Sequence, residues 1–177
     1  MPRSLRSLLL PLLLLLGASG PALGSGEAAP RGRFAGTYTF AGGAPEQAAR
    51  DAAISKAVES LFFLIRPLAR SRLDAGKPVP PLLSFAFSDG KITVIQSGRP
   101  PATSPEDGTP TALKAHLTVT QRFDPEGHLV QSFVTPEGAR TNVYVLTPDG
   151  RTVQQNVEVT SGRLPKPLRF SLTYRKQ

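Results

Sequence analysis

Three glutamines interrupt the apolar faces of three β-strands that the sequence predicts. Each has one large apolar residue two positions before it and another two positions after it; the three are Gln121, Gln131 and Gln155. In a meander of strands these positions fall at the same end of a barrel, where the amides form a polar layer inside its mouth. A side-chain amide both donates and accepts hydrogen bonds, and a buried one needs partners. The pattern therefore predicts mutual pairing, bound water or the polar head of a ligand, unless the strand ends are simply open to solvent.

The same spacing motivates a hypothesis about a ligand. An amphiphile would place its polar head among the three glutamines and run its tail toward four aromatic side chains, Tyr38, Phe62, Phe63 and Phe170. These seven residues are the candidate ligand-binding residues. Replacing all three glutamines with leucine is expected to change the affinity for such a ligand, because the polar contacts of its head would be lost.

Catalytic chemistry has few candidates in this chain. A general base needs an oriented partner and a cleft, and the chain has only two histidines, His116 and His128. Both fall on the polar face of an expected strand, and the one carboxylate expected near either of them is Glu126, beside His128 in a turn. Paired carboxylates are lacking as well, because the other acidic residues occur where turns favour them. We therefore expect a protein that is not an enzyme.

Metal and cofactor chemistry is limited by composition. The chain has no cysteine, which excludes disulfides, iron–sulfur ligation and thiol nucleophiles. Two histidines leave little for a transition-metal site. The glycine-rich segments do not match phosphate-binding loops, which connect a strand to a helix. No metal and no cofactor are expected.

The chain is basic, with 21 Lys and Arg against 13 Asp and Glu and a formal net charge of +8. Proteins that bind single-stranded nucleic acid interleave aromatic side chains with their basic residues. Here only Phe170 and Tyr174 are placed in this way, at a spacing that points them inward, so we expect no nucleic-acid partner. The basic residues are interpreted as a solvated face, and the alternative is peripheral attraction to an anionic lipid or envelope polymer.

Residues 1–24 have the pattern of a secretory signal peptide. Arg3 and Arg6 precede a leucine-rich run of about ten residues, too short to span a bilayer, and small residues follow it. We expect cleavage between Gly24 and Ser25, and hence a periplasmic or extracellular protein that is soluble after cleavage. Residues 25–32 are small and polar, and we expect a disordered lead-in. The bias toward Leu, Ala, Gly, Pro and Arg favours a bacterial source with a GC-rich genome.

The polar candidates depend on the elements that position them. Residues 34–40 alternate large and small side chains at period two, which predicts a strand. Apolar residues then follow at steps of three and four from Ile54 to Leu68, which predicts a helical region over 45–75. Because Pro67 interrupts it, we expect two helices, over about 45–65 and 67–75.

The rest of the chain predicts strands and turns. Leu82–Phe87 and Lys91–Gln96 flank a Ser-Asp-Gly hairpin turn, residues 97–111 are expected to be a long loop, and residues 113–123 alternate as one strand. Three Pro-x-Gly turns, with glycines at Gly127, Gly138 and Gly150 where positive φ is expected, then separate strands over about 128–135, 139–147 and 151–160. A last strand is expected over 168–174.

These elements predict a mainly β fold. It is an antiparallel meander of about eight strands, closed as a barrel or strongly curled, with a helical insertion after the first strand that caps one end. Residues 33–177 form one domain.

The layout resembles the calycin group, which comprises lipocalins and intracellular lipid-binding proteins. Gly36, Thr37 and Tyr38 stand where lipocalins carry Gly-x-Trp, within a strand that also holds Phe34 and Phe40. A helical pair between the first two strands is similar to the fatty-acid-binding branch. The chain departs from these families in having no tryptophan, fewer than ten expected strands and no C-terminal helix. The resemblance implies a carrier of an apolar ligand.

We therefore expect an exported, non-enzymatic carrier or binding protein that holds a hydrophobic or amphiphilic small molecule in its barrel. The alternative is a cell-envelope scaffold or assembly protein with a filled barrel. In that case its basic surface or the Pro-rich segment 97–111 would contact another protein.

Overall fold

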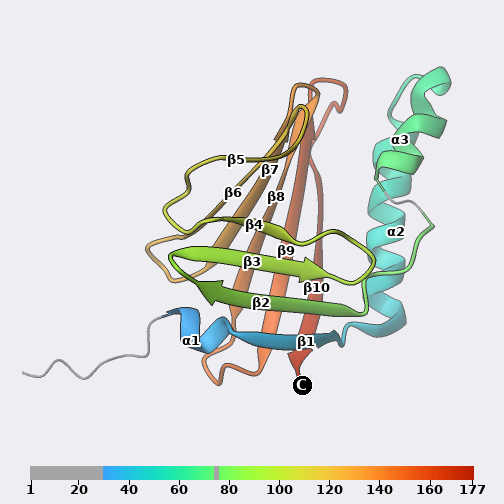
Figure 1. Cartoon of the computed structure of the whole chain (residues 1–177). Coiled ribbons are helices and arrows are strands. Elements are labelled where there is room, and N and C mark those ends of the chain that lie inside the picture. The colour runs from blue at the N-terminus through green and yellow to red at the C-terminus, as the bar shows by residue number, and fades with distance from the viewer. Residues whose placement is uncertain (1–29, 74–75) are drawn as a thin grey trace, which may run out of the picture.

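The computed structural model describes residues 30–73 and 76–177, and these residues form ten antiparallel strands in one sheet (Figure 1). The expected signal peptide and the first part of the expected lead-in lie outside the described residues. The fold class is mainly β, as expected, and the helical insertion follows the first strand. The expectation of about eight strands is wrong, because two short strands were missed between residues 97 and 116.

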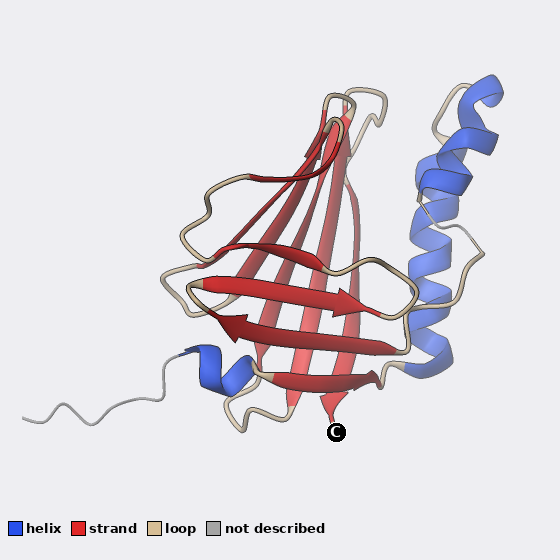
Figure 2. Ribbon diagram, in the orientation of Figure 1, coloured by secondary structure: helices blue, strands red, loops and turns tan. Residues whose placement is uncertain are grey.

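The sheet curls into a nearly closed barrel with two crossing layers (Figure 2). The strands of the first layer are β1 (Gly36–Phe40), β2 (Leu82–Ser88), β3 (Lys91–Gln96) and β4 (Ala102–Pro105). Those of the second are β5 (Thr111–Lys114), β6 (Leu117–Phe123), β7 (Leu129–Thr135), β8 (Gly138–Leu146), β9 (Thr152–Ser161) and β10 (Leu168–Lys176). β1 pairs with β10 to join the layers, and β4 and β5 are the two edges.

The segment expected to be a loop over 97–111 contains β4 and the start of β5. β4 pairs with β3 from Lys91↔Pro105 to Val94↔Ala102, so its one proline, Pro105, lies at a sheet edge, where a missing N–H is tolerated. The strand expected over 113–123 is also wrong in part, because the chain turns back at His116, where φ is +62°. The alternation of residues continues through this turn, so periodicity alone did not reveal it.

A short helix, α1 (Pro30–Phe34), precedes the first strand. It corrects two expectations, since residues 30–32 are ordered and Phe34 ends a helix rather than starting a strand. Phe34 is buried, and its carbonyl accepts a hydrogen bond of 3.0 Å from the Tyr38 hydroxyl. Gly36 between them has φ +128°, a conformation that favours glycine.

The helical region consists of α2 (Gly43–Glu59), a 3₁₀ turn η1 (Phe63–Ile65) and α3 (Arg66–Arg72). The break falls at residues 60–62, earlier than expected, and Pro67 lies in the first turn of α3. Proline is tolerated there because the N–H that it lacks would have no partner within the helix. Ile54 and Val58 bury the face of α2 against Leu168 and Phe170 of β10.

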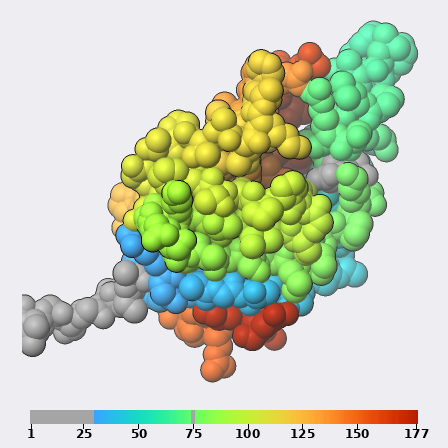
Figure 3. All heavy atoms as spheres, in the orientation of Figure 1, coloured from blue at the N-terminus to red at the C-terminus, as the bar shows by residue number. Residues whose placement is uncertain are grey.

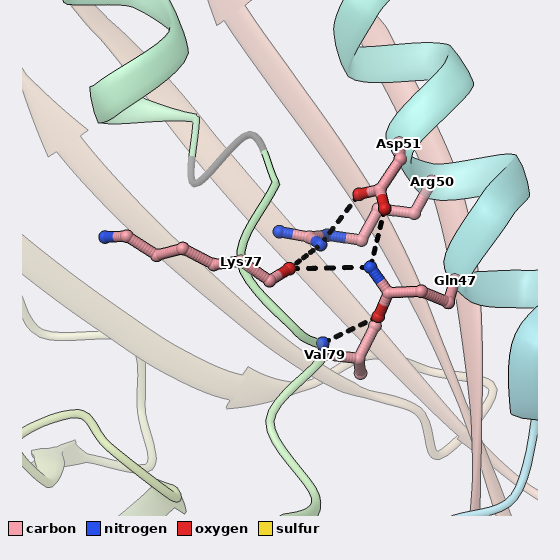
Figure 4. Close-up of polar contacts among 5 residues, drawn as sticks. All are labelled: Gln47, Arg50, Asp51, Lys77 and Val79. Carbon is pink, nitrogen blue, oxygen red and sulfur yellow. Dashed lines mark hydrogen bonds and ion pairs between the residues drawn. The ribbon is translucent and has the colours of Figure 1, made fainter.

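Polar contacts fasten α2 to the segment that leads into β2 (Figure 4). The Gln47 side chain accepts a hydrogen bond of 2.8 Å from the Val79 N–H. Arg50, which is buried, donates to the Lys77 carbonyl at 2.7 Å and forms an ion pair with Asp51 at 3.0 Å. At the start of the helix, the Glu46 carboxylate accepts hydrogen bonds from the backbone and hydroxyl of Thr173. The base of the helical pair is therefore fixed to the barrel.

The three Pro-x-Gly turns occur where expected, but their glycines differ. Gly127 and Gly150 have φ of +81° and +70°, as expected for such turns. Gly138 does not have a positive φ. It begins β8, where an added Cβ would collide with the Thr160 carbonyl oxygen of β9. The expectation of a positive φ at Gly138 is therefore wrong, and this glycine allows a close approach of two strands.

The barrel interior far from the helical tip is filled. Large buried side chains from nine segments pack there, among them Phe34, Tyr38, Phe85, Tyr144 and Tyr174. Edge-to-face ring contacts, such as Phe85 with Tyr144 at 5.0 Å between centroids, join the two layers. Among residues 30–73 and 76–177, no helix has the length and apolar character needed to cross a membrane.

Candidate ligand-binding site

The three glutamines singled out in the sequence lie together inside the barrel, and all are buried. Gln121 on β6 pairs in register with Gln131 on β7, and Gln131 pairs with Asn142 on β8. Gln155 on β9 lies diagonally from Asn142 on the same face. We call Gln121, Gln131, Asn142 and Gln155 the amide row.

Hydrogen bonds in the amide row all run in the same direction. Gln155 donates to Asn142 at 3.2 Å, Asn142 donates to Gln131 at 2.9 Å, and Gln131 donates to Gln121 at 2.9 Å. At the β9 end of the row, the Gln96 side chain of β3 donates to the Gln155 carbonyl oxygen at 3.4 Å. Each amide thus uses its carbonyl oxygen toward one neighbour and its NH₂ group toward the other.

The row ends at the seam between the two edges of the sheet. The Gln121 NH₂ group donates to the Ile92 carbonyl at 2.8 Å, to the Ala102 carbonyl at 3.3 Å and to the Ser104 hydroxyl at 3.0 Å. These acceptors belong to β3 and β4, whereas Gln121 belongs to β6. A side chain therefore supplies the hydrogen bonds that a strand ladder would otherwise provide across the gap.

Two further donors complete the amide row. Tyr144 donates its hydroxyl to Gln131 at 3.0 Å, and Arg140 donates to Asn142 at 3.0 Å. Among the described residues, no buried side-chain nitrogen or oxygen atom is without a hydrogen-bond partner. Of the alternatives raised by the sequence, the structure shows mutual pairing, so the polar head of a ligand is not needed to satisfy these amides.

Burial keeps the tyrosines in this core protonated. Tyr38, Tyr144 and Tyr174 are the three tyrosines of the chain, and each side chain is fully buried. Loss of solvation raises the pKa of Tyr38 to about 12 and also raises the pKa values of Tyr144 and Tyr174. Their hydroxyls therefore act as hydrogen-bond donors at neutral pH.

A cavity of about 610 Å³ lies at the opposite end of the barrel from the filled core. It opens between the helical region and the ends of β6 to β9, where Figure 3 shows the surface hollowed beside the projecting helical tip. Its walls are largely apolar, with large side chains contributed by Leu61, Ile65, Leu73, Leu117, Phe133 and Val159. We call it the mouth cavity. Its size falls within the range of small-molecule pockets.

The polar part of the mouth cavity is mainly basic. Its lining includes His116, four Lys or Arg side chains and one acidic side chain; the last five are Arg72, Lys114, Arg140, Arg163 and Glu137. Glu137 forms an ion pair with Arg72 that links the β7–β8 turn to α3. An apolar interior with a basic rim suits a molecule that has a hydrophobic body and a polar, preferably anionic, end.

A smaller hollow of about 120 Å³ lies between α2, α3 and the inside of the sheet. Arg50, Arg99, Arg140 and Gln96 line it together with Phe170. It lies next to the amide row, since Gln96 and Arg140 contact both. Phe170 also packs on the filled core and on the cluster of Ile54, Val58 and Leu168 beneath α2, so it lies between the core and the helical pair.

The aromatic residues expected to surround a ligand tail do not gather in one place. Tyr38 belongs to the filled core, and Phe170 lines the smaller hollow. Phe62 and Phe63 lie outside the barrel, with 64% and 62% of their surfaces exposed. Placing them beside Tyr38 and Phe170 is therefore wrong, because α2 ends at Glu59 and the chain turns outward after the buried Leu61.

Sequence reasoning missed most of the mouth cavity and two members of the polar network. Asn142 could have been found, because Arg140, Asn142 and Tyr144 occupy alternate positions of one strand and so share a face. Ser104 lay in a segment taken for a loop. The cavity walls come from strand ends and helix turns, which carry no periodic pattern of their own.

The two histidines occupy turns rather than strand faces. His116 is exposed at the β5–β6 turn. The His128 Nδ1–H donates to the Asp124 carboxylate at 3.0 Å, and the same carboxylate accepts the His128 backbone N–H at 2.8 Å. The sequence analysis named only Glu126 beside His128. Asp124, Glu126 and His128 have potential ligand atoms within 4.8 Å of one another, but the bonds to Asp124 already account for its position as the closure of a hairpin.

Comparisons with known proteins identify a similar fold. No protein-family model and no curated protein sequence match the chain. A solved structure does match: the crystal structure of a secretary abundant heat soluble (SAHS) protein from Ramazzottius varieornatus, with a TM-score of 0.52 and 10% identity. The match covers 82% of this chain and 96% of that one. Together with the observed topology, it shows that the described part of the chain folds as a nearly closed antiparallel β-barrel, which fits the resemblance to lipocalins and fatty-acid-binding proteins noted in the sequence.

Proposed function

We propose that this protein is a carrier or binding protein for a hydrophobic or amphiphilic small molecule, held in the mouth cavity. The observation that carries the proposal is a space of about 610 Å³ with mostly apolar walls. Burying the apolar body of a ligand there releases free energy in proportion to the area removed from water. The calycin-type barrel supports the proposal because such barrels can hold one small ligand.

The polar end of the ligand lies at the basic rim in this proposal, rather than at the amide row. The amides are already paired with one another, and inserting a head group among them would break good hydrogen bonds. Arg140 and Arg163 at the rim offer charged donors, which favour a carboxylate or phosphate. This revises the orientation of the amphiphile that was expected from the sequence.

Three further expectations complete the proposal. The protein is exported, it acts outside the cytoplasm after removal of residues 1–24, and it binds its ligand without chemical conversion. The Leu-rich segment after Arg3 and Arg6 supports export. The pairing of His128 with Asp124 in a turn, away from the mouth cavity, supports a structural role for that histidine.

Native mass spectrometry of residues 25–177, purified from the periplasm, tests this function. The protein is measured before and after extraction with organic solvent. An additional mass that extraction removes would support the carrier and identify its ligand class. A clean apo mass, together with no uptake from a panel of lipids, would reject it.

A cavity-filling substitution ties binding to this particular site. Ala69 of α3 lines the mouth cavity, so Ala69→Phe should lower the affinity for the ligand about tenfold or more by occupying its space. Ala52→Phe is the matched control, because Ala52 is an exposed residue of α2 that does not line the cavity. Equal affinities of the two variants would place the ligand elsewhere.

The alternative function is that of an envelope scaffold or assembly protein. The filled core around Phe85 and Tyr144 favours it, because that end of the barrel is packed with side chains and has no room for a ligand. In this case the mouth cavity binds no small molecule, and capture experiments with the exported protein recover a protein partner.

A further inference from the structure

Four apolar side chains are exposed together at the tip of the helical pair. Phe62, Phe63, Leu64 and Leu68 expose 64%, 62%, 68% and 48% of their surfaces, and the two rings contact each other at 4.8 Å between centroids. We call these four residues the tip patch. Leu68 also lines the mouth cavity, so it lies between the rest of the tip patch and that cavity. Figure 3 shows that this part of the helical region projects beyond the rest of the molecule. Clustered apolar exposure of this kind marks an interaction site.

The turn that carries the tip patch has a defined shape. The Arg66 guanidinium donates to the Glu59 carbonyl at 2.8 Å, which caps the last residue of α2, and to the Leu61 carbonyl at 3.0 Å in the turn that follows. Leu61 is buried on the inner side of the same turn. With the backbone fixed in this way, Phe62 and Phe63 are held outward and cannot join Leu61 in the cavity wall.

Basic residues surround the tip patch. Among the described residues, the helical tip and the neighbouring turns between β5 and β6, β7 and β8, and β9 and β10 hold six basic side chains and two acidic ones; these are Arg66, Arg70, Arg72, Lys114, Arg163, Lys166, Glu59 and Glu137. The other end of the long strands mixes both signs, with the carboxylates of Asp124, Glu126 and Asp149 beside basic residues such as Arg151 and Arg175. The end of the molecule that exposes aromatic rings is thus also positively charged.

We propose that the tip patch docks on an anionic phospholipid bilayer. Aromatic and leucine side chains would enter the interface between head groups and acyl chains, while the arginines contact lipid phosphates. A second copy of the chain fits less well. Symmetric pairing through this patch would bring Arg66 and Arg70 of one copy against the same residues of the other, and like charges repel. The proposal does not depend on the ligand of the mouth cavity, although docking would direct that cavity toward the bilayer.

A fluorescence experiment tests the contact directly. Because the chain has no tryptophan, Phe63→Trp introduces a single probe at the tip patch. Residues 25–177 are used, so that the apolar run of the signal peptide does not itself bind lipid. With vesicles of phosphatidylcholine containing about a third phosphatidylglycerol, we expect a blue shift of the emission and quenching by brominated acyl chains. Ile95→Trp, at an exposed strand position away from the tip, is the control and should show neither effect.

Vesicle sedimentation separates the apolar and the electrostatic contributions. The double variant F62S/F63S should bind anionic vesicles about tenfold or more weakly than the unchanged protein, whereas Ile95→Ser should bind equally well. Arg70→Glu should weaken binding, and Arg175→Glu, at an exposed position of the opposite end, should weaken it less. Pure phosphatidylcholine vesicles should bind little of any variant.

Three results would overturn the proposal. The first is equal binding of F62S/F63S and the unchanged protein to anionic vesicles. The second is the absence of a spectral change in Phe63→Trp, and the third is a dimer in solution that F62S/F63S dissociates while no vesicle binding occurs. Ligand binding by F62S/F63S in the mouth cavity is measured in parallel, and its retention would separate failure of the docking surface from failure of the proposed function.

Discussion

Gln131 has the most demanding position in the amide row. Its carbonyl oxygen accepts hydrogen bonds from both Asn142 and Tyr144, and its NH₂ group donates to Gln121. No water is needed to complete these contacts in the interior. The energetic importance of such a residue comes less from the bonds themselves than from the groups that would be left unpaired without it.

Gln131→Leu should lower the free energy of unfolding by about 3 kcal/mol or more, because three buried polar groups lose their partner at once. The matched control is Gln154→Leu on the outer face of β9, where the glutamine is exposed and a change within about 0.5 kcal/mol is expected. Denaturant unfolding followed by circular dichroism measures both. A small effect at Gln131 would mean that the row rearranges or that water enters it.

The tyrosines predict an alkaline limit to stability. Their pKa values are raised above the ordinary value of 10.0 in the folded state, to about 12 for Tyr38. The unfolded chain therefore releases protons first, and the stability present below pH 10 is lost as the pH rises toward and beyond the folded values. Tyrosinate absorbance during a pH titration should stay low near pH 10 and then appear together with the loss of circular dichroism. A gradual titration near pH 10 with the fold intact would contradict the burial of these residues.

Residue-level prediction succeeded where a polar residue broke an apolar face. Gln121, Gln131 and Gln155 were found because each interrupts a regular alternation, and the structure places all three in one buried row. Whether they affect ligand affinity stays a prediction. Phe62 and Phe63 were misplaced because a helical stripe shows which residues share a face, but it does not show where the helix ends.

At the level of the element, the three Pro-x-Gly turns show that one sequence pattern can serve two purposes. Gly150 provides a left-handed backbone conformation with open space around it, whereas Gly138 provides room for the backbone of β9. Sequence alone could place these turns, but it could not separate the two uses, because the close approach at Gly138 depends on Thr160 of the following strand, β9.

Substitution of these glycines should separate the two uses. Gly150→Asn should be nearly neutral, since asparagine tolerates the left-handed region. Gly138→Asn should cost about 3 kcal/mol, because any side chain collides with β9. Thermal or denaturant unfolding of the two variants gives the comparison, and equal losses would mean that the β8–β9 contact is not as close as described.

The missed elements have a common physical cause. β4 and β5 are short edge strands with prolines nearby, and each pairs with its neighbour along the chain, β3 and β6. Four residues are too few to show a clear alternation of apolar and polar side chains, so their composition did not reveal them. The hairpin at Asp89 and Gly90 was predicted correctly because both residues carry the positive φ that such a turn requires locally. The geometry of a turn is determined by the few residues that form it, whereas closure of the barrel depends on strands that are far apart in the sequence.

On the scale of the whole molecule, the barrel is divided into a packed end and a hollow end. The packed end gives the stability that a chain without disulfides needs, and the mouth cavity leaves apolar surface that a ligand can cover. The sequence predicted the barrel and a helical cap. The volume of the cavity could not be predicted from any one segment, because it depends on how side chains from several elements pack together.

Ligand binding should therefore stabilise the whole fold. At a free ligand concentration of about one hundred times Kd, the gain is about 2.7 kcal/mol, provided that the unfolded chain does not bind. For a chain of this size the melting temperature should rise by roughly 5–10 °C. Differential scanning calorimetry measures the shift, and Ala69→Phe should abolish most of it while Ala52→Phe retains it.

The amide row has a consequence for how the strands find one another. A strand that slides by two residues keeps its apolar side chains facing inward, so hydrophobicity alone hardly distinguishes the slipped sheet from the correct one. In the slipped sheet, however, Gln121, Gln131 and Asn142 would face apolar neighbours and lose their partners. Four amides on four consecutive strands thus select one register of those strands. The fold of the barrel is specified by the polar residues that interrupt its core as well as by the apolar residues that form it.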